Sequence, residues 1–311
     1  MANFSLDDNK PPTPAPKKAP KKAASFDSPQ ERGTPAKGDD GINLDALKQY
    51  WLEDTTLESK LVLMLLGSDG VAKSGIALDY LTDEDIAAGK RAMIIDLDGG
   101  NVPLLIAHHK ERVEAAGRKL SDAYLVKNPL AEDDEGNIDY EGTYRNVREA
   151  IYLAKHAWHD LNLKYVVFDG LSTALKHAEN QMRVEKNLDA DGGVQMRFWL
   201  VRNKLFLEML EQLKGLPISS MFIAHEDFIL KPLEDNSSVK EKANAMVHQK
   251  VLCERVEDKA NKQIVFRATV TKSKYRADSE GSRFNICVVD KSGEGESTVT
   301  WGTKDLYEAL L

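Results

Sequence analysis

Short apolar segments alternate with amphipathic segments over most of the chain. Apolar runs of strand length occur at residues 60–66, 92–98, 123–126, 165–169 and 218–224. Two longer segments, residues 144–158 and 198–213, carry apolar side chains at helical spacing. This alternation is typical of an α/β fold in which helices flank a mostly parallel central sheet.

The last third of the chain has a different pattern. Residues 264–272 and 284–289 both have strand character, and the segment between them leaves no room for a helix. We therefore expect a C-terminal β-hairpin beside the parallel sheet. No internal repeat is visible in the sequence.

The first 40 residues differ in composition from the rest of the chain. They hold seven of the 11 prolines and almost no large apolar side chain, so burial cannot offset the entropy lost on ordering. We expect a disordered Pro/Lys-rich tail over residues 1–40 and a folded domain over residues 41–311. The tail has a lysine cluster without acids, which favours either a tether to DNA or an acidic partner, or a solubilising tail: Lys10, Lys17, Lys18, Lys21 and Lys22.

Composition limits the classes of function. The chain has 311 residues, of which 42% are hydrophobic and 30% are charged, so it can bury a sizeable core. The net charge of −8 at first argues against a nucleic-acid partner, but contacts with DNA need only a local basic surface. The two cysteines, Cys253 and Cys287, lack metal-ligand spacing and indicate a reducing compartment. Since no signal peptide or membrane-spanning stretch is present, we expect a cytoplasmic protein with no membrane partner.

A loop with the chemistry of a phosphate-binding site follows the first predicted strand. Residues 67–74 have the sequence GSDGVAKS, one residue away from the pattern GxxxxGK[ST]. In such a loop the backbone N–H groups and the next helix N-terminus surround a polyphosphate. Ala72 replaces the second glycine and adds a methyl group near the phosphates. The alternative is an ordinary strand-to-helix turn.

The loop predicts two cofactors, ATP and Mg²⁺. Lys73 is expected to contact the β- and γ-phosphates, and the Ser74 hydroxyl to hold Mg²⁺. Asp169, which ends the apolar run YVVFD, is expected to orient the same metal. A buried strand ending in an acid is a weak signal alone, but it gains weight from its position after the loop. The predicted nucleotide-binding residues are Gly67, Ser68, Asp69, Gly70, Val71, Ala72, Lys73, Ser74 and Gly75.

These two motifs resemble those of the RecA/RadA family of recombinase-type P-loop ATPases, in the family's order. A third segment, IIDLD at residues 94–98, is similar to the family's strand ending in Asp-x-Glu, in which the Glu activates the attacking water. The resemblance gives Asp98 that role, with a shorter carboxylate. The alternative is a surface turn of acids.

Two later segments extend the resemblance. His225 is the last residue of the segment FIAH at residues 222–225, where the family has a Gln that senses the γ-phosphate. An imidazole can also donate a hydrogen bond to a phosphate. The alternative is a histidine with a structural role. The basic segment at residues 270–276 is similar to the family's late Lys-x-Lys element. The resemblance implies that Lys272 and Lys274 act on the ATP of a neighbouring subunit, and a solvated basic hairpin is the alternative.

The resemblance covers residues 57–290 and is closest to the compact RecA-like ATPases of phages, which assist single-strand annealing. It implies a homo-oligomer, either a filament or a ring, that assembles on single-stranded DNA. A single-strand-binding protein is a further expected partner. If the protein is phage-encoded, the expected location is the host cytoplasm. Two loops, at residues 173–197 and 227–262, are expected to line the DNA path. Their cations are Lys176, Arg183, Lys186, Arg197, Lys231, Lys240, Lys242 and Lys250.

The expected function is therefore that of a DNA-dependent ATPase in recombination, single-strand annealing or repair. Two alternatives remain open at this point. One is a nucleotide-gated DNA-binding scaffold with little turnover, which the substitutions at Ala72 and Asp98 favour. The other is a ring-forming helicase or packaging-type motor built on the same core.

Overall fold

The computed structural model describes residues 60–99, 106, 109–189, 192–225, 237–291 and 298–311. The predicted tail at residues 1–40 and Lys231 lie outside these residues, so the expectations for them stay predictions. The predicted start of the folded domain at residue 41 lies outside them as well.

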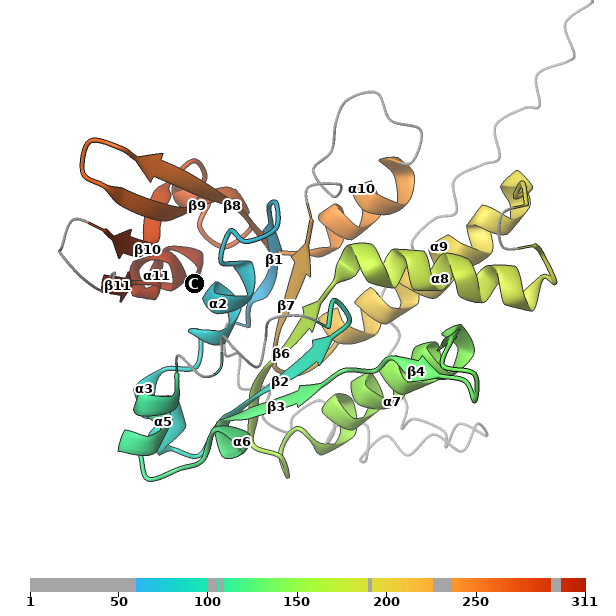
Figure 1. Cartoon of the computed structure of the whole chain (residues 1–311), viewed down its shortest axis with the longest axis horizontal. Helices are drawn as coiled ribbons and strands as arrows, with labels where there is room; N and C mark the ends of the chain where they lie inside the picture. Colours follow the sequence, from blue (N-terminus) through green and yellow to red (C-terminus); the bar gives the residue numbers. More distant parts are fainter. Residues whose placement is uncertain (1–59, 100–105, 107–108, 190–191, 226–236, 292–297) are drawn as a thin grey trace, which may run out of the picture. The chain divides into compact units, whose positions relative to one another are not determined.

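The described residues form one nine-stranded sheet with the strand order β11-β10-β9-β8-β1-β7-β6-β2-β3 (Figure 1). Neighbouring strands from β3 to β8 run parallel, and those from β8 to β11 run antiparallel. The parallel strands are β1 (Val62–Leu66), β2 (Arg91–Asp96), β3 (Tyr124–Lys127), β6 (Leu163–Asp169), β7 (Ser219–Ala224) and β8 (Gln249–Asp258). The antiparallel extension consists of β9 (Gln263–Ser273), β10 (Arg283–Asp290) and β11 (Thr298–Trp301).

Helices cover both faces of this sheet. The first set is α2 (Lys73–Leu78), α3 (Asp83–Ala87), α5 (Lys110–Ala115), α6 (Leu120–Ala123) and α11 (Lys304–Leu310). The second set is α7 (Tyr140–Ala157), α8 (Leu171–Glu185), α9 (Met196–Lys214) and α10 (Ser237–Met246). A small hairpin of β4 (Ala131–Glu132) and β5 (Ile138–Asp139) precedes α7, and a 3₁₀ turn covers Ala277–Ser279.

The central strand β1 explains why both faces need cover. All five of its residues are buried, and successive side chains point to opposite faces. Leu63 and Leu65 belong to the core under the first set of helices, whereas Val62 and Met64 belong to the core under the second set. A strand buried on both faces carries an unbroken apolar run, which is the pattern that identified β1 in the sequence.

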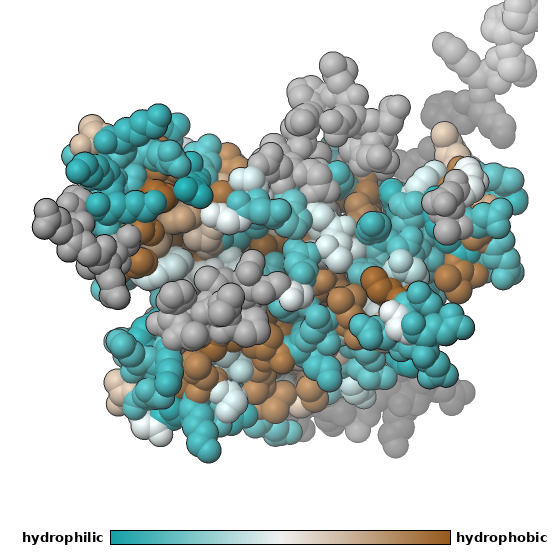
Figure 2. Space-filling view, in the orientation of Figure 1, coloured by the Kyte–Doolittle hydropathy of each residue, from teal (hydrophilic) through white to brown (hydrophobic). Residues whose placement is uncertain are grey.

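The predicted fold class is confirmed: the structure is α/β, with a mostly parallel sheet between helices and an antiparallel C-terminal hairpin. The hairpin of β9 and β10 is part of a larger extension than predicted, because β8 and β11 pair with its two edges. In this view the tip of the β8–β9 hairpin, at the upper left, is hydrophilic (Figure 2). No helix within the described residues has the length and hydrophobicity needed to cross a bilayer.

The two predicted DNA-path loops are wrong over much of their length. Most of residues 173–197 belongs to α8 and to the start of α9, while residues 227–262 include α10 and β8. The buried face of α8 contains His177 and Gln181, and these polar residues hide the helical period. In β8 only the first half alternates between buried and less buried positions, which weakens the strand signal.

Candidate active site

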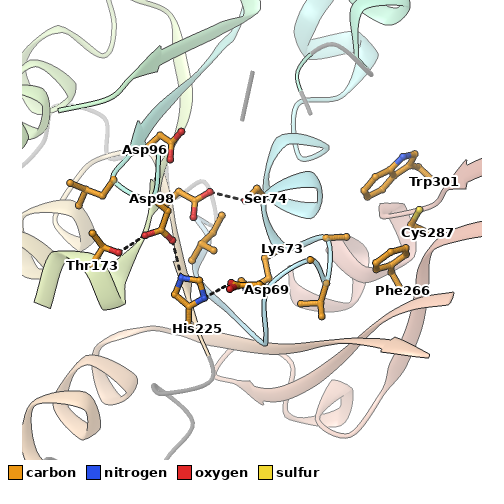
Figure 3. Close-up of a pocket in the computed structure, with 16 residues that line it drawn as sticks. Asp69, Lys73, Ser74, Asp96, Asp98, Thr173, His225, Phe266, Cys287 and Trp301 are labelled. Atoms are coloured by element: carbon orange, nitrogen blue, oxygen red, sulfur yellow. Dashed lines mark hydrogen bonds and ion pairs between the residues drawn. The ribbon is translucent and has the colours of Figure 1, made fainter. Parts of the chain in front are cut away.

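A cavity of about 820 Å³ opens at the carboxyl ends of β1, β2, β6 and β7 (Figure 3). The loop after β1 contributes residues 69–72 to its lining. Parallel α/β sheets commonly bind ligands at this edge. The residues that line it are Asp69, Gly70, Val71, Ala72, Lys73, Ser74, Asp96, Leu97, Asp98, Asp169, Thr173, Ile223, His225, Phe266, Cys287 and Trp301. The structure therefore brings together most of the predicted site residues.

The loop backbone contains residues with positive φ, including Gly67 and Ala72. Gly67 has φ +151°, and a Cβ at this position would collide with the backbone oxygen of Cys253 on β8. Ala72 has φ 65° and ψ 19°, the left-handed conformation. Non-glycine residues adopt this conformation at a cost, so the chain keeps the turn of the glycine pattern without its second glycine.

The Lys73 ammonium is held inside this turn. The side chain is 7% exposed, and its Nζ donates hydrogen bonds to the carbonyl oxygens of Gly67 at 2.8 Å and Ser68 at 2.6 Å. Desolvation lowers the pKa of Lys73, while the nearby carboxylates, Asp69 first, oppose the shift. A partly desolvated ammonium at the cavity wall is well placed to attract a polyphosphate.

Ser74 and Asp169, the two residues predicted to share a metal, contact each other directly at the wall of the cavity. The Ser74 hydroxyl donates to Asp169 Oδ2 at 2.7 Å, and Asp169 is paired in register with Asp96 on β2. Burial raises the pKa of Asp169 to about 6, although the Ser74 hydrogen bond acts in the opposite direction. Desolvation, with a contribution from Asp98, also raises the pKa of Asp96.

The donor set suits a metal that takes part of its coordination from a substrate. In the part of the chain that the structure describes, no three His, Cys, Asp or Glu side chains converge to hold a metal on their own. Mg²⁺ is commonly bound by one or two protein oxygens together with substrate phosphates and water. The hydroxyl of Ser74 and the carboxylate of Asp169 fit that requirement.

His225 lies between two carboxylates that the sequence did not connect (Figure 3). Its Nδ1 is 2.8 Å from Asp69 Oδ1 and its Nε2 is 3.0 Å from Asp98 Oδ2. The other oxygen of Asp98 accepts a hydrogen bond from the Thr173 hydroxyl. This chain of contacts links the phosphate-binding loop, the end of β2 and the end of β7 through one imidazole.

Gly170 and α8 explain why Asp98 lies at this position. Gly170 has φ +104°, and a Cβ there would collide with Asp98 Oδ1. Its missing side chain allows the carboxylate to approach the first turn of α8, where Thr173 lies. A helix N-terminus is favourable for a negative charge. Sequence reasoning missed Thr173 because the segment was assigned to a loop.

Lys272 and Lys274 lie away from this cavity. In the register of β8 and β9, Lys272 pairs with Lys250, and the Lys274 N–H binds the carbonyl oxygen of His248. His248 precedes β8, so these residues lie toward the amino ends of the parallel strands, opposite the phosphate-binding loop. Neither lysine lines the cavity of its own chain, and the role that the resemblance implies for them in a neighbouring subunit stays a prediction.

The two lysines differ in their surroundings. Lys272 Nζ donates to the carbonyl oxygens of Asn244, Ala245 and Val247 at 2.9, 3.3 and 2.8 Å, and it therefore caps the end of α10. Desolvation first, then Lys274, lowers its pKa. Lys274 is exposed and is the better placed of the two to reach another subunit.

One of the cations predicted to bind DNA has a structural role instead. Arg183 donates to the carbonyl oxygens of Asp189 and Gly192, both at 2.9 Å, and pairs with Glu179. It therefore stabilises the connection between α8 and α9. Lys176, in the first half of α8, and Lys186, directly after its last residue, are exposed and remain candidates for phosphate contacts.

A further wall of the cavity was missed entirely by the sequence patterns. Phe266, Cys287 and Trp301 line the side formed by the antiparallel extension, beyond α2 from Asp98 and Thr173 (Figure 3). They come from three different strands, so only the pairing register brings them together.

No family model matches the chain, and no curated protein matches it in sequence. Solved structures are similar to it in fold. The RadB recombinase has 15% identity and a TM-score of 0.43, with 74% of this chain and 88% of that chain covered. The flagellar accessory protein FlaH from Methanocaldococcus jannaschii has 10% identity and a TM-score of 0.38, covering 77% and 89%. A KaiC-like protein from Pyrococcus horikoshii OT3 has 12% identity and a TM-score of 0.39, covering 76% and 88%.

At these identities the likenesses concern the fold, and the function of this chain has to come from the geometry of its cavity. The predicted phage-type subgroup stays a prediction.

Proposed function

We propose that this chain is a Mg²⁺-dependent ATP hydrolase of the RecA-like P-loop type, acting on single-stranded DNA as a homo-oligomer. The observation that carries the proposal is the meeting of Ser74 and Asp169 at 2.7 Å beside the buried ammonium of Lys73. A hydroxyl, a carboxylate and an ammonium around a turn of backbone amides are the groups that Mg²⁺ and a triphosphate require.

Each of these groups has a defined task. The turn from Gly67 to Ser74 binds the phosphates through backbone N–H groups, and Lys73 exchanges its contacts with two carbonyl oxygens for contacts with phosphate oxygens. Ser74 and Asp169 hold Mg²⁺, which supplies charge neutralisation on the phosphates when bound.

Asp98 acts as the general base toward the attacking water. The Thr173 hydroxyl and the His225 imidazole, in contact with its two oxygens, orient the carboxylate. His225 also contacts Asp69 of the phosphate-binding loop. A phosphate that binds the imidazole would therefore change the contacts that His225 makes with Asp69 and with Asp98. In this proposal His225 senses the γ-phosphate by exchanging a carboxylate partner for a phosphate oxygen.

The remaining parts of the proposal concern assembly. Lys274, with Lys272, acts on the nucleotide bound by a neighbouring subunit, where a cation stabilises transition-state charge. Nucleotide binding orders the oligomer on DNA, and hydrolysis releases it. The setting is DNA recombination, single-strand annealing or repair in the cytoplasm, with a single-strand-binding protein as a further partner.

Steady-state phosphate release, with and without single-stranded DNA, tests this function. The full-length protein is expected to hydrolyse ATP only with Mg²⁺ and faster with DNA, and Asp98→Asn is expected to keep ATP binding but lose turnover. A protein that binds Mg²⁺ and ATP but shows negligible turnover under every condition would refute the hydrolase assignment.

A nucleotide-gated scaffold is the second candidate, and one observation favours it. Both oxygens of Asp98 are already engaged, by Thr173 and by His225, which leaves the shorter carboxylate less free to accept a proton from water. In that case ATP would promote DNA binding without being consumed. DNA affinity measured with ATP and with a non-hydrolysable analogue would then be equal, and both would exceed the affinity without nucleotide.

A further inference from the structure

The antiparallel extension places three apolar side chains in one row beside the phosphate-binding loop. Phe266 on β9 is directly opposite Cys287 on β10, and Cys287 is directly opposite Trp301 on β11. Residues directly opposite in antiparallel strands project from the same face of a sheet. The three side chains therefore form a continuous strip across three strands, and all of them line the cavity.

Pairing register also explains how this strip comes to lie beside the loop. The last residue of β1, Leu66, is level with Leu252 of β8, whereas Phe266 pairs with Arg255, three residues further along β8. The extension therefore projects beyond the carboxyl end of β1, over the edge where the loop begins. Its inner face includes Ala268, which belongs to the core under α2 and α11.

The strip is packed on one side and accessible on the other. Trp301 lies against the first turn of α2, because a Cβ at Gly75 would be within 3.3 Å of three atoms of its indole ring. Trp301 and Phe266 are nevertheless only partly buried. Burial raises the pKa of the Cys287 thiol to about 11, so this residue is neutral at pH 7 and adds an apolar contact. No charged side chain interrupts the row.

We propose that Phe266 and Trp301, with Cys287 between them, form the surface that binds the nucleobase of the nucleotide. This inference rests on the proposed function, since the phosphates must first be placed at Lys73 and Ser74. When the phosphates are bound there, the base of the same nucleotide can reach the side of the cavity that Phe266, Cys287 and Trp301 line. Aromatic side chains can stack on any nucleobase.

The chemistry of the strip predicts weak discrimination between purine bases. Among the described cavity-lining residues, this side offers two aromatic rings and a neutral thiol, with no amide, carboxylate or cationic side chain to distinguish the amino group of adenine from the carbonyl group of guanine. Sites that select strongly between such groups do so with hydrogen bonds, and apolar pockets discriminate weakly. ATP and GTP should therefore bind with similar affinities.

Isothermal titration with Mg²⁺ and three probes, ATP, GTP and inorganic tripolyphosphate, tests the proposal on the full chain. Trp301→Leu is expected to weaken ATP and GTP binding about tenfold each, with tripolyphosphate binding unchanged. Phe266→Leu is expected to act in the same direction, and Trp301→Phe to restore most of the affinity. Trp199→Leu on α9, which does not line the cavity, is the matched control.

The outcomes separate this proposal from the proposed function. If the wild type binds neither tripolyphosphate nor ATP, the phosphate-binding site fails and the base surface fails with it. If the wild type binds both, but Trp301→Leu leaves ATP affinity unchanged or weakens tripolyphosphate equally, the base surface alone is refuted. A preference of the wild type for ATP over GTP beyond tenfold would overturn the claim of weak discrimination. Unchanged tripolyphosphate binding also establishes that Trp301→Leu is folded.

Discussion

Ala72 is the residue at which sequence and backbone conformation disagree most clearly. Its φ of 65° is one that glycine adopts freely and alanine does not. Ala72→Gly is therefore expected to raise the free energy of unfolding by about 1 kcal/mol, because relief of this strain outweighs the added freedom of the unfolded chain. Chemical denaturation of the two proteins measures the difference. Equal or lower stability of the glycine variant would contradict the left-handed conformation at this position.

Thr173 is expected to position Asp98 through its hydroxyl. Thr173→Val removes that hydrogen bond while preserving the shape of the side chain, so kcat for ATP hydrolysis should fall about tenfold. KM should change little, since Thr173 is not among the residues proposed to bind the phosphates.

Thr173→Ser keeps the hydroxyl and serves as the control for this prediction. It should retain most of the wild-type kcat. Equal losses in the valine and serine variants, or a change confined to KM, would show that the hydroxyl does not orient Asp98.

Several residues of the site follow from local sequence alone. The turn from Gly67 to Ser74 lies on consecutive residues, and Asp169 ends a strongly apolar strand, so both were predicted. Residues 69–74 of the turn and Asp169 line the cavity. Thr173, Phe266 and Trp301 were not predicted. Their proximity depends on helix start points and on pairing between strands, which no short motif encodes.

At the scale of elements, α3 is joined to β6 by a partly buried ion pair. Asp85 of α3 contacts Lys164 of β6 and Lys90, the latter at 3.1 Å. Burial raises the pKa of Asp85, but hydrogen bonds and charge from Lys164, together with Lys90 and Thr82, outweigh it and bring the pKa below its ordinary value of 3.8. The carboxylate therefore stabilises the folded chain above that pH, and the stabilisation is lost as the pH falls through the lower folded-state pKa.

Asp85→Asn is expected to lower the free energy of unfolding at pH 7 by about 3 kcal/mol, because it leaves a desolvated ammonium without its partner. Denaturation curves measured from pH 7 down to pH 3 should show the difference between wild type and variant shrinking below pH 3.8. A difference that is constant over this range would mean that ionisation of Asp85 does not contribute.

The elements that the sequence failed to predict share a physical cause. Polar residues on the buried face of α8, and charges in the outer half of β8, break the apolar period on which such predictions depend. By contrast β1, β6 and β7 are buried along almost their whole length, and their apolar runs are unmistakable.

For the whole molecule, the proposal requires that subunits share active sites. Lys274 is the better probe, because replacing Lys272 also removes three hydrogen bonds at the end of α10. Lys274→Ala should bind ATP normally but lose turnover. In an equal mixture of Lys274→Ala and Lys73→Ala subunits, roughly a quarter of the shared sites combine an intact phosphate-binding loop from one subunit with an intact Lys274 from its neighbour. ATPase activity should therefore return to about a quarter of the wild-type value.

The mixture is compared with each variant alone at the same total concentration. No recovery on mixing, with assembly verified by light scattering, would contradict the sharing of sites. Recovery at a dilution where only monomers exist would contradict it as well.

The central claim is that the turn after β1 binds a triphosphate through Lys73, and isothermal titration of Mg²⁺ and ATP into the wild type and Lys73→Ala tests it most directly. The wild type should bind one ATP per chain, and the variant should lose measurable binding while unfolding at a similar denaturant concentration. ATP affinity in a folded Lys73→Ala protein equal to that of the wild type would contradict the assignment of this cavity.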